Sequence, residues 1–128
     1  MPSSIINTAF YAPIKGVISD AFDQRKKHFG IDVVAPKNEA IKATLPGTVV
    51  LSSWTTETGY TMAIQHEDDL ISFYKHNSVL LKNIGEKVLA GDVIAIIGNS
   101  GSLSSGPHLH FELWHKGKAI NPQHHIIF

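Results

Sequence analysis

Residues 106–112 read Gly106-Pro107-His108-Leu109-His110-Phe111-Glu112 and contain two histidines two positions apart. Such spacing suits an extended strand, in which side chains two positions apart point to the same face of the sheet. The stretch therefore predicts a β-strand over residues 108–114 that presents both imidazoles on one side.

A second pair of metal-binding side chains lies far upstream, in His28-Phe29-Gly30-Ile31-Asp32. His28 and Asp32 are four positions apart, so a strand would place them on one face as well. Gly30 between them has no side chain to crowd an ion on that face. If both strands lie side by side, they gather three histidines and one carboxylate. Catalytic zinc sites use about three nitrogen or oxygen ligands and keep a position for water, so the pattern predicts a zinc site with one histidine left over.

Short strand patterns separated by turn residues occupy much of the chain. They cover residues 47–51, 61–66, 70–74 and 93–97, and residues 115–118 read as a hairpin turn. Close spacing of this kind predicts an all-β fold, with antiparallel sheets in a compact sandwich or barrel-sandwich hybrid and little helix. The best helical candidate is the segment 77–83. Biotin- and lipoyl-carrying domains use similar turns, but no lysine here has the setting that they require.

Length and composition restrict the protein classes. The 128 residues predict one domain over 1–128, with a loosely held arm over 1–11, a core over 12–122 and a tail over 123–128. The formal net charge of zero gives no electrostatic footprint for nucleic acid or an anionic membrane. The absence of cysteine excludes thiolate sites, thiol catalysis and disulfides. No targeting signal or membrane-spanning run is visible, so we expect a monomeric cytosolic protein or a segment of a longer chain.

Eight histidines is a high number for this length and hints at metal binding or proton transfer. His76 follows a predicted strand, and its local sequence alone indicates an ordinary loop residue. The remaining four histidines have no partner at a useful spacing, and we expect them to face solvent: His66, His115, His124 and His125.

Taken together, these motifs resemble those of the lysostaphin-type, or LytM-like, zinc metallopeptidases, which cut peptidoglycan peptides. The resemblance runs from about Pro13 to Pro122. The segments that carry it are 28–32 (HFGID), 35–36 (AP), 47–49 (GTV), 74–76 (YKH), 85–91 (GEKVLAG), 98–101 (GNSG), 106–112 (GPHLHFE) and 121–122 (NP). One departure is Asn77 after His76, where the family often has leucine.

The resemblance implies a role for each of five residues. It implies that His28, Asp32 and His110 bind one zinc ion per chain, and that His76 and His108 are the catalytic histidines. His76 thereby gains a role that its spacing does not indicate.

Three further residues are secondary candidates: Tyr74, Glu112 and Asn99. A regular strand would place Tyr74 on the face of His76, where its hydroxyl would assist an oxyanion or its ring would pack; we favour packing. Glu112 shares a face with His110 and would accept a hydrogen bond from a ligating histidine or form a structural salt bridge. Asn99 lies in the glycine-rich segment 98–101.

The resemblance implies a zinc-dependent endopeptidase of the cell envelope whose partners are peptidoglycan stem peptides or cross-bridges. Zinc lowers the pKa of a bound water from about 15.7 to about 7, and a histidine beside the water would accept its proton. Members of the family cut D-alanyl–diaminopimelate cross-links or glycine bridges. We favour the former because no extra wall-targeting segment is present. Loops around 55–60 and 98–106 would make this choice.

Two other functions fit part of the pattern. Some members of the family have lost ligands and act as binding or regulatory modules for other wall hydrolases, whereas the five functional positions are intact here. A phosphocarrier of related β architecture would also use two histidines, but it would need neither Asp32 nor a metal. Zinc content separates this last class from the first two.

Overall fold

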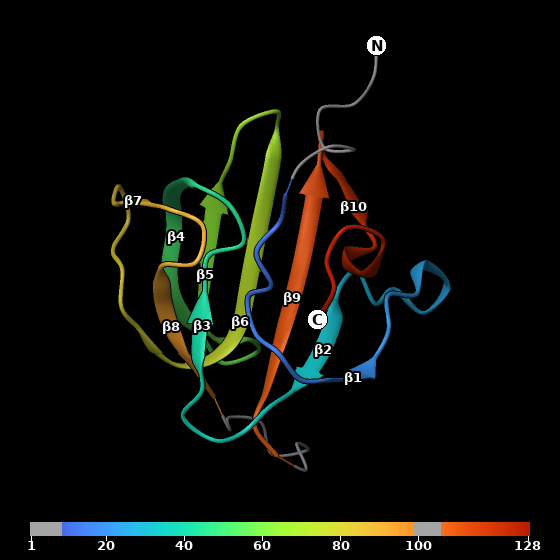
Figure 1. Cartoon of the computed structure of the whole chain (residues 1–128). Coiled ribbons are helices and arrows are strands. Elements are labelled where there is room, and N and C mark those ends of the chain that lie inside the picture. Colours follow the sequence, from blue (N-terminus) through green and yellow to red (C-terminus); the bar gives the residue numbers. More distant parts are fainter. Residues whose placement is uncertain (1–8, 99–105) are drawn as a thin grey trace.

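The computed structural model describes residues 9–98 and 106–128, which form ten strands and two 3-10 helices (Figure 1). The strands are β1 (Val17–Asp20), β2 (Ile31–Val34), β3 (Ala40–Lys42), β4 (Gly47–Thr55), β5 (Gly59–Gln65), β6 (Leu70–Leu80), β7 (Lys87–Val88), β8 (Val93–Ile97), β9 (His108–His115) and β10 (Lys118–Ile120). The helices are η2 (Gln24–Lys26) and η3 (Pro122–His124). In these two described ranges, neither helix has the length and apolar character needed to cross a membrane.

All ten strands join one antiparallel sheet, so the all-β prediction with little helix is confirmed. The main path runs β1-β2-β9-β6-β5-β4-β7, while β10 pairs with β9, β8 pairs with β6, and β3 pairs with β8. Strands β2 and β9 are neighbours although most of the chain separates them, and Figure 1 shows them side by side at the right of the sheet. This pairing positions the site described below.

The segment 77–83 is not helical, so that prediction was wrong. Its first four residues continue β6, because Asn77, Val79 and Leu80 pair with β8. A short apolar run such as Val-Leu-Leu fits either a helix or a buried strand. Here an available neighbouring strand decides the outcome.

The core lies on one face of the sheet, where alternate residues of the central strands are fully buried. Along β9, Leu109, Phe111 and Leu113 are inaccessible to solvent, and Tyr74 of β6 packs against Phe111 with ring centroids 5.3 Å apart. Burial of each such side chain stabilises the fold by about 1.5–3 kcal/mol. The other face of β6 and β9 is partly exposed and carries histidine side chains together with Ile71, Phe73 and Trp114.

Both ends of the described chain pack on this core. Ile126 is buried and Phe128 lies 6.0 Å from Phe111 between ring centroids, so residues 126 and 128 are anchored although we expected a loose tail. At the other end, the N–H of Tyr11 donates to the carbonyl of Thr44 over 2.9 Å. The rest of the expected N-terminal arm, residues 1–8, lies outside the described residues.

His66 is buried, so the expectation that it faces solvent was wrong. Its Nδ1 donates to the carbonyl of Pro46 (2.8 Å), and its Nε2 lies 2.7 Å from Ser72 Oγ, which lies 2.7 Å from the Tyr74 hydroxyl. Burial lowers the pKa of His66 by more than the Pro46 carbonyl raises it. Burial also raises the pKa of Tyr74 to about 12. Uncharged His66 therefore belongs to a buried polar chain.

The other three histidines expected at the surface differ in exposure. His124 is exposed as predicted, whereas His115 and His125 are half-buried. The ring of His125 lies 5.8 Å from that of Phe10 between centroids, and burial lowers the pKa of His125.

His66 should make the protein less stable in mild acid. Unfolded His66 takes up a proton near its ordinary pKa of about 6.5, whereas the folded form resists protonation. Its contribution is therefore complete above about pH 6.5 and is lost as pH falls through the lower pKa of the folded state. Urea unfolding at about pH 7.5 and about pH 5.5 measures this slope.

Replacement His66→Gln should cost about 1–3 kcal/mol near neutral pH, because buried hydrogen bonds are lost, and should flatten the pH dependence. The matched control His124→Gln changes an exposed histidine and should keep the slope of the wild type. Equal slopes in all three proteins would contradict the assignment.

Candidate metal centre and active site

The register of β2 with β9 brings an acidic and a basic side chain together. Asp32 pairs directly with His110, and Val34 pairs with His108. Asp32 Oδ1 lies 2.7 Å from His110 Nδ1, across a separation of 78 residues in the chain. The two extended segments thus meet with these side chains in direct contact.

His28 reaches the same place from outside a strand, because β2 begins only at Ile31. A turn holds it: backbone hydrogen bonds of 2.9 and 3.0 Å join His28 to Asp23, and Lys27 between them has a positive φ of 57°. His28 Nδ1 donates to the carbonyl of Ala21 (2.8 Å), which turns Nε2 toward Asp32 Oδ2 at 3.5 Å. The expectation that His28 and Asp32 share one strand face was therefore wrong, although the two side chains do meet.

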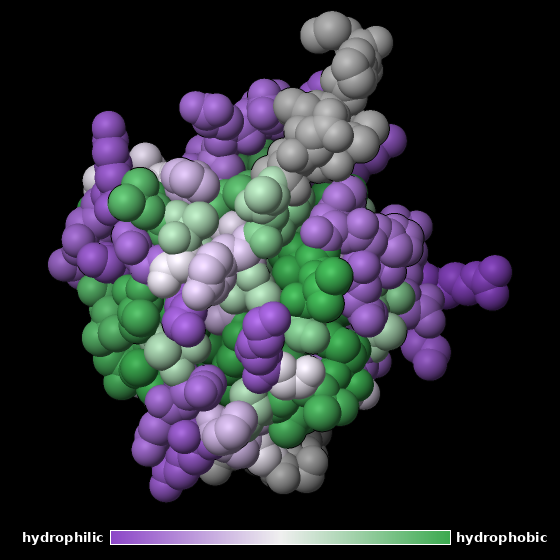
Figure 2. Space-filling view, in the orientation of Figure 1, coloured by the Kyte–Doolittle hydropathy of each residue, from purple (hydrophilic) through white to green (hydrophobic). Residues whose placement is uncertain are grey.

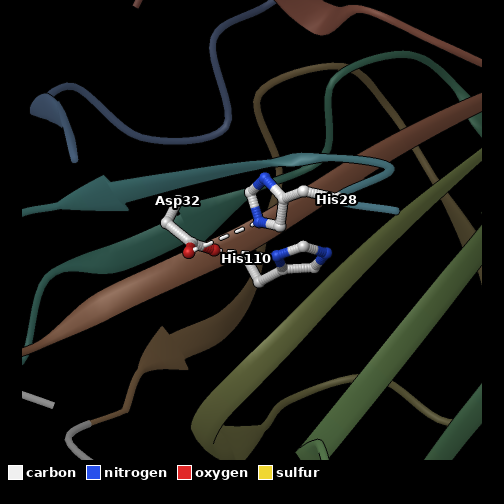
Figure 3. A group of neighbouring side chains, drawn as sticks. All are labelled: His28, Asp32 and His110. Carbon is white, nitrogen blue, oxygen red and sulfur yellow. Dashed lines mark hydrogen bonds and ion pairs between the residues drawn. The ribbon is translucent and has the colours of Figure 1, made fainter. Parts of the chain in front are cut away.

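His28, Asp32 and His110 each offer one ligand atom, and these three atoms lie within 4.8 Å of one another (Figure 3). Zinc–nitrogen and zinc–oxygen bonds near 2.1 Å place neighbouring tetrahedral ligands about 3.4 Å apart. The 3.5 Å between His28 and Asp32 already fits this spacing, and the 2.7 Å contact between Asp32 and His110 has to lengthen by less than about 1 Å. Two imidazole nitrogens and one carboxylate are also a common catalytic zinc donor set.

Gly30 is required at this position for a steric reason that the sequence pattern only partly indicates. A Cβ atom there would lie 2.4 Å from the carbonyl oxygen of Phe111 and 3.0 Å from His110 Nε2. The close approach of the backbone to β9, more than the space for an ion, therefore excludes a side chain.

His76 joins the cluster through a bulge in β6. Tyr60 pairs with Asn77 and Met62 pairs with Tyr74, so β6 has one extra residue between these pairs. His76 adopts a positive φ of 68°, and its N–H donates to the carbonyl of Thr58 (2.9 Å). The extra residue reverses the alternation of side chains after Tyr74. Tyr74 is fully buried and faces the core, whereas His76 faces the cluster. The expectation of a shared face with His76 was wrong, whereas packing of Tyr74 was correct.

The histidine rings follow one another across the sheet. Centroid distances are 5.2 Å from His28 to His110, 6.2 Å from His110 to His76, and 5.1 Å from His76 to His108. His108 donates from Nδ1 to the carbonyl of Gly106 (3.3 Å). All five residues named from the sequence therefore lie in one cluster.

Glu112 is held by three neighbours. Its Oε2 lies 2.7 Å from His110 Nε2 and 3.1 Å from Lys75 Nζ, and its Oε1 accepts a 2.8 Å hydrogen bond from Trp114 Nε1. Burial would raise the pKa of Glu112, but these hydrogen bonds and the charge of Lys75 lower it to about 2. An ionised Glu112 fixes the ring of His110 from the side opposite Asp32. Both readings of Glu112 apply, because it contacts the histidine and forms a salt bridge.

Sequence reasoning did not identify Lys75, Trp114 or Asp20 as parts of this site. Lys75 pairs with His110 in the β6–β9 register, so its place depends on tertiary pairing alone. Trp114 continues the alternation of His110 and Glu112, a signal that the sequence did contain. Asp20 lies 3.7 Å from His28 Nε2 and is largely exposed.

The charges of the cluster shift its ionisation. Burial would raise the pKa of Asp32, but the hydrogen bond and positive charge of His110 outweigh it and lower the pKa. Burial likewise works to lower the pKa of His110, whereas Asp32 and Glu112 raise it. Burial and the neighbouring His108 lower the pKa of His76. His76 is thus inclined to be neutral.

An apolar trough leads away from the cluster on the same face of the sheet. Ile71 and Phe73 of β6 pair with Trp114 and Glu112 of β9, and together they line a hollow of about 360 Å³ that also includes Lys75. Ile71 and Lys75 are four residues apart, which is about 13.6 Å along a strand, so the hollow has about the length of four residues of an extended peptide. Asn99 and residues 99–105 of the expected specificity loop lie outside the described residues.

The sequence profile of Peptidase family M23 matches residues 26–122, which contain all five clustered residues. The chain belongs to peptidase family M23. The predicted resemblance to lysostaphin-type peptidases is therefore confirmed. Family membership explains all the histidine motifs together, because the matched region contains every one of them.

Three relatives show the range of the similarity. Murein hydrolase activator NlpD of Escherichia coli is 35% identical over 116 residues, which cover 89% of this chain and 30% of NlpD. A zinc-containing peptidase from Vibrio cholerae superposes with a TM-score of 0.82 at 27% identity, over 89% of this chain and 39% of the other. The catalytic domain of lysostaphin from Staphylococcus simulans gives a TM-score of 0.68 at 25% identity, over 91% and 87% of the two chains. The chain thus spans less than a third of the length of NlpD.

Metal binding should separate the two groups of histidines. His110→Ala removes a ligand atom and should reduce bound zinc from about one ion per chain to less than about a tenth of that. His108→Ala leaves the three converging atoms in place and should retain the zinc. Emission spectrometry after dialysis against zinc measures both variants. Equal zinc loss in both variants would contradict the division of roles.

Glu112 should affect zinc affinity without touching the ion. Glu112→Gln removes the charge that orients His110, so zinc should bind about 10–100-fold more weakly. Competition with a chromogenic chelator gives the dissociation constant. Glu67→Gln, at an exposed carboxylate, is the matched control and should leave the affinity unchanged; a Glu112→Gln value equal to that control would show that Glu112 only packs.

Proposed function

We propose that this protein is a zinc-dependent endopeptidase that hydrolyses peptidoglycan peptides. The observation that carries the proposal is the convergence of His28, Asp32 and His110 to within 4.8 Å, beside the rings of His76 and His108. Membership of peptidase family M23 supports it. The similarity to a zinc-containing peptidase supports the choice of metal.

In this proposal His28, Asp32 and His110 hold one zinc ion. When bound, zinc acts as a Lewis acid and makes water a better nucleophile at neutral pH. The chain itself fixes the ligands: Ala21 orients His28, and Glu112 orients His110. These outer contacts set which nitrogen of each ring faces the centre.

His76 and His108 are the proton-transfer residues in this proposal. Both rings lie beside the ligands, and the lowered pKa of His76 favours the neutral form that accepts a proton. A protonated imidazole can then donate to the leaving amine or stabilise negative charge on the substrate oxygen. The His76 and His108 rings are in contact, so one ring can accept a proton while the other donates one.

The trough beside the cluster suits a peptide chain. Its Ile71, Phe73 and Trp114 side chains offer an apolar floor, and Lys75 and Glu112 stand at the end near His110. We propose that a stem peptide or cross-bridge lies along it, with D-alanyl–diaminopimelate as the preferred cross-link. The corresponding place of action is the cell envelope, consistent with relatives named as lipoproteins and murein hydrolase activators. In this proposal the segment 1–128 acts as one monomeric peptidase domain.

A second candidate function is regulation of other wall hydrolases. NlpD, at 35% identity, is named a murein hydrolase activator. Under this alternative the domain binds a partner hydrolase and does not cut peptidoglycan itself. The intact set of clustered residues favours the enzyme.

Cleavage of purified peptidoglycan sacculi should distinguish the two functions. Zinc-loaded protein should release soluble muropeptides with new amino termini, and a chelator should abolish the release until zinc is restored. His76→Ala and His108→Ala should each lower the rate by about 10²–10⁴-fold, because general acid–base catalysis supplies an acceleration of this size. Chromatography with mass spectrometry identifies the bond that is cut.

The control variant is His124→Ala, at an exposed histidine outside the cluster, which should retain full activity. Sacculi that stay intact with zinc-loaded protein, together with faster digestion by a second wall hydrolase in the presence of the protein than by that hydrolase alone, would favour the activator and contradict the enzyme.

A further inference from the structure

A second hollow lies over β4, β5 and the last residues of β6. Its volume is about 390 Å³, and Trp54, Tyr60, Ser53 and Asn83 are among its lining residues. The chain that follows β6 runs along the outer edge of β4, where the N–H of Gly85 donates to the carbonyl of Val49 (2.8 Å). This hollow is distinct from the trough on β6 and β9.

Two aromatic rings form the wall of this hollow. Trp54 and Tyr60 are directly paired across the hairpin, so they share one face, and they are 55% and 42% exposed. Figure 2 shows further hydrophobic surface at the left of the view, where the chain around β7 lies in front of β4 in Figure 1. A tryptophan and a tyrosine exposed side by side leave apolar ring surface in water that burial in a core would remove. Such paired exposed rings indicate contact with a ligand.

The remaining lining carries no charge: it consists of three serines and one asparagine together with Val79 and Leu80. Ser52 Oγ donates to the Lys82 carbonyl (2.9 Å) and Ser78 Oγ donates to the Ile97 carbonyl (3.0 Å), so each hydroxyl still has oxygen lone pairs to accept a bond. The Ser53 and Asn83 side chains have no hydrogen-bond partner in the part of the chain that the structure describes. The hollow therefore offers flat rings with neutral donors and acceptors.

A sugar ring has these same properties in complementary form. Its C–H faces pack on aromatic rings, and its hydroxyls and acetamido groups exchange hydrogen bonds with neutral polar side chains. A peptide with charged groups would gain nothing from an uncharged lining. We propose that this hollow binds a saccharide strand, with a pyranose ring against Trp54 and Tyr60.

The hairpin that lines the hollow is hydrogen-bonded to the part of β6 that carries His76. Asn77 pairs with Tyr60 and donates from Nδ2 to its carbonyl (3.0 Å), while the carbonyl of Thr58 in the same hairpin accepts from the N–H of His76. The hairpin that would hold a glycan strand thus also holds the backbone of His76. The identity of the strand as the glycan of peptidoglycan rests on the proposed function, whereas saccharide binding itself does not.

The test is fluorescence titration of the full chain with a β-1,4-linked N-acetylglucosamine hexamer, which contains no peptide bond to cut. Trp54 and Trp114 are the two tryptophans of the chain. Trp114→Phe leaves Trp54 as the reporter and should show a saturable emission change, whereas the matched variant Trp54→Phe should show none. Chelator-treated protein should bind equally well, which separates this result from success or failure of the peptidase.

Calorimetry with the same hexamer quantifies the loss. Trp54→Ala should weaken binding at least about tenfold, or about 1.4 kcal/mol, and Asn83→Ala should weaken it less. Both positions are at the surface, and unchanged melting temperatures would show that the variants are folded. Two results would overturn the proposal: no saturable binding up to about 10 mM hexamer, corresponding to less than about 2.7 kcal/mol of affinity, or equal affinity in Trp54→Ala and wild type. Tighter binding of an alanine–glycine peptide than of the hexamer would also overturn it and assign the hollow to a peptide.

Discussion

The contact between Asp32 and His110 across β2 and β9 is the constraint on which the site depends. Strand register alone places the carboxylate of Asp32 2.7 Å from the imidazole of His110, because the two residues are directly paired. A shift of either strand by one residue would send its member of the pair to the core face. The fully buried neighbour on that strand, Val33 in β2 or Leu109 in β9, would then face solvent. The apolar core therefore enforces the register that creates the polar cluster.

Around this rigid pair, the remaining members arrive by irregular backbone. His28 comes from a turn closed by Asp23, and His76 comes from a bulge with a positive φ. Non-glycine residues rarely adopt such a conformation, and it persists where surrounding structure over-determines it. In His76 the hydrogen bond to Thr58 and the strand pairing on both sides provide that support. Regular strand pairing therefore positions Asp32 and His110, and irregular backbone positions His28 and His76.

Period-two patterns explain why much of this could be read from the sequence. Residues 93–97 were predicted as a strand and form β8, and the His108–Trp114 stretch forms nearly all of β9. These segments have strong alternation or continuous β-branched residues, so local preference and tertiary pairing agree. The short strands β1, β3 and β7 have no such pattern and form only because a neighbour supplies partners.

The misses share one physical cause, which is dependence on partners distant in sequence. Nothing near His66 indicates that Pro46 and Ser72 will enclose it. The bulge that separates Tyr74 from His76 exists because β5 has one residue fewer over the same span. Lys75 reaches Glu112 only through the β6–β9 register. His76 was identified by family resemblance, because its own spacing gave no signal.

Strand β6 changes neighbours at the bulge: it pairs with β9 up to Lys75 and with β8 from Asn77 onward. His76 thus stands where the sheet forks, whereas His28, Asp32 and His110 all lie on one branch. Any deformation that widens the fork would carry the imidazole of His76 away from an otherwise undisturbed set of proposed ligands. If the proposed function holds, redesigned versions of the β8 half could bind their full complement of ion and still turn over poorly, so metal stoichiometry alone would be an insufficient criterion of a working domain.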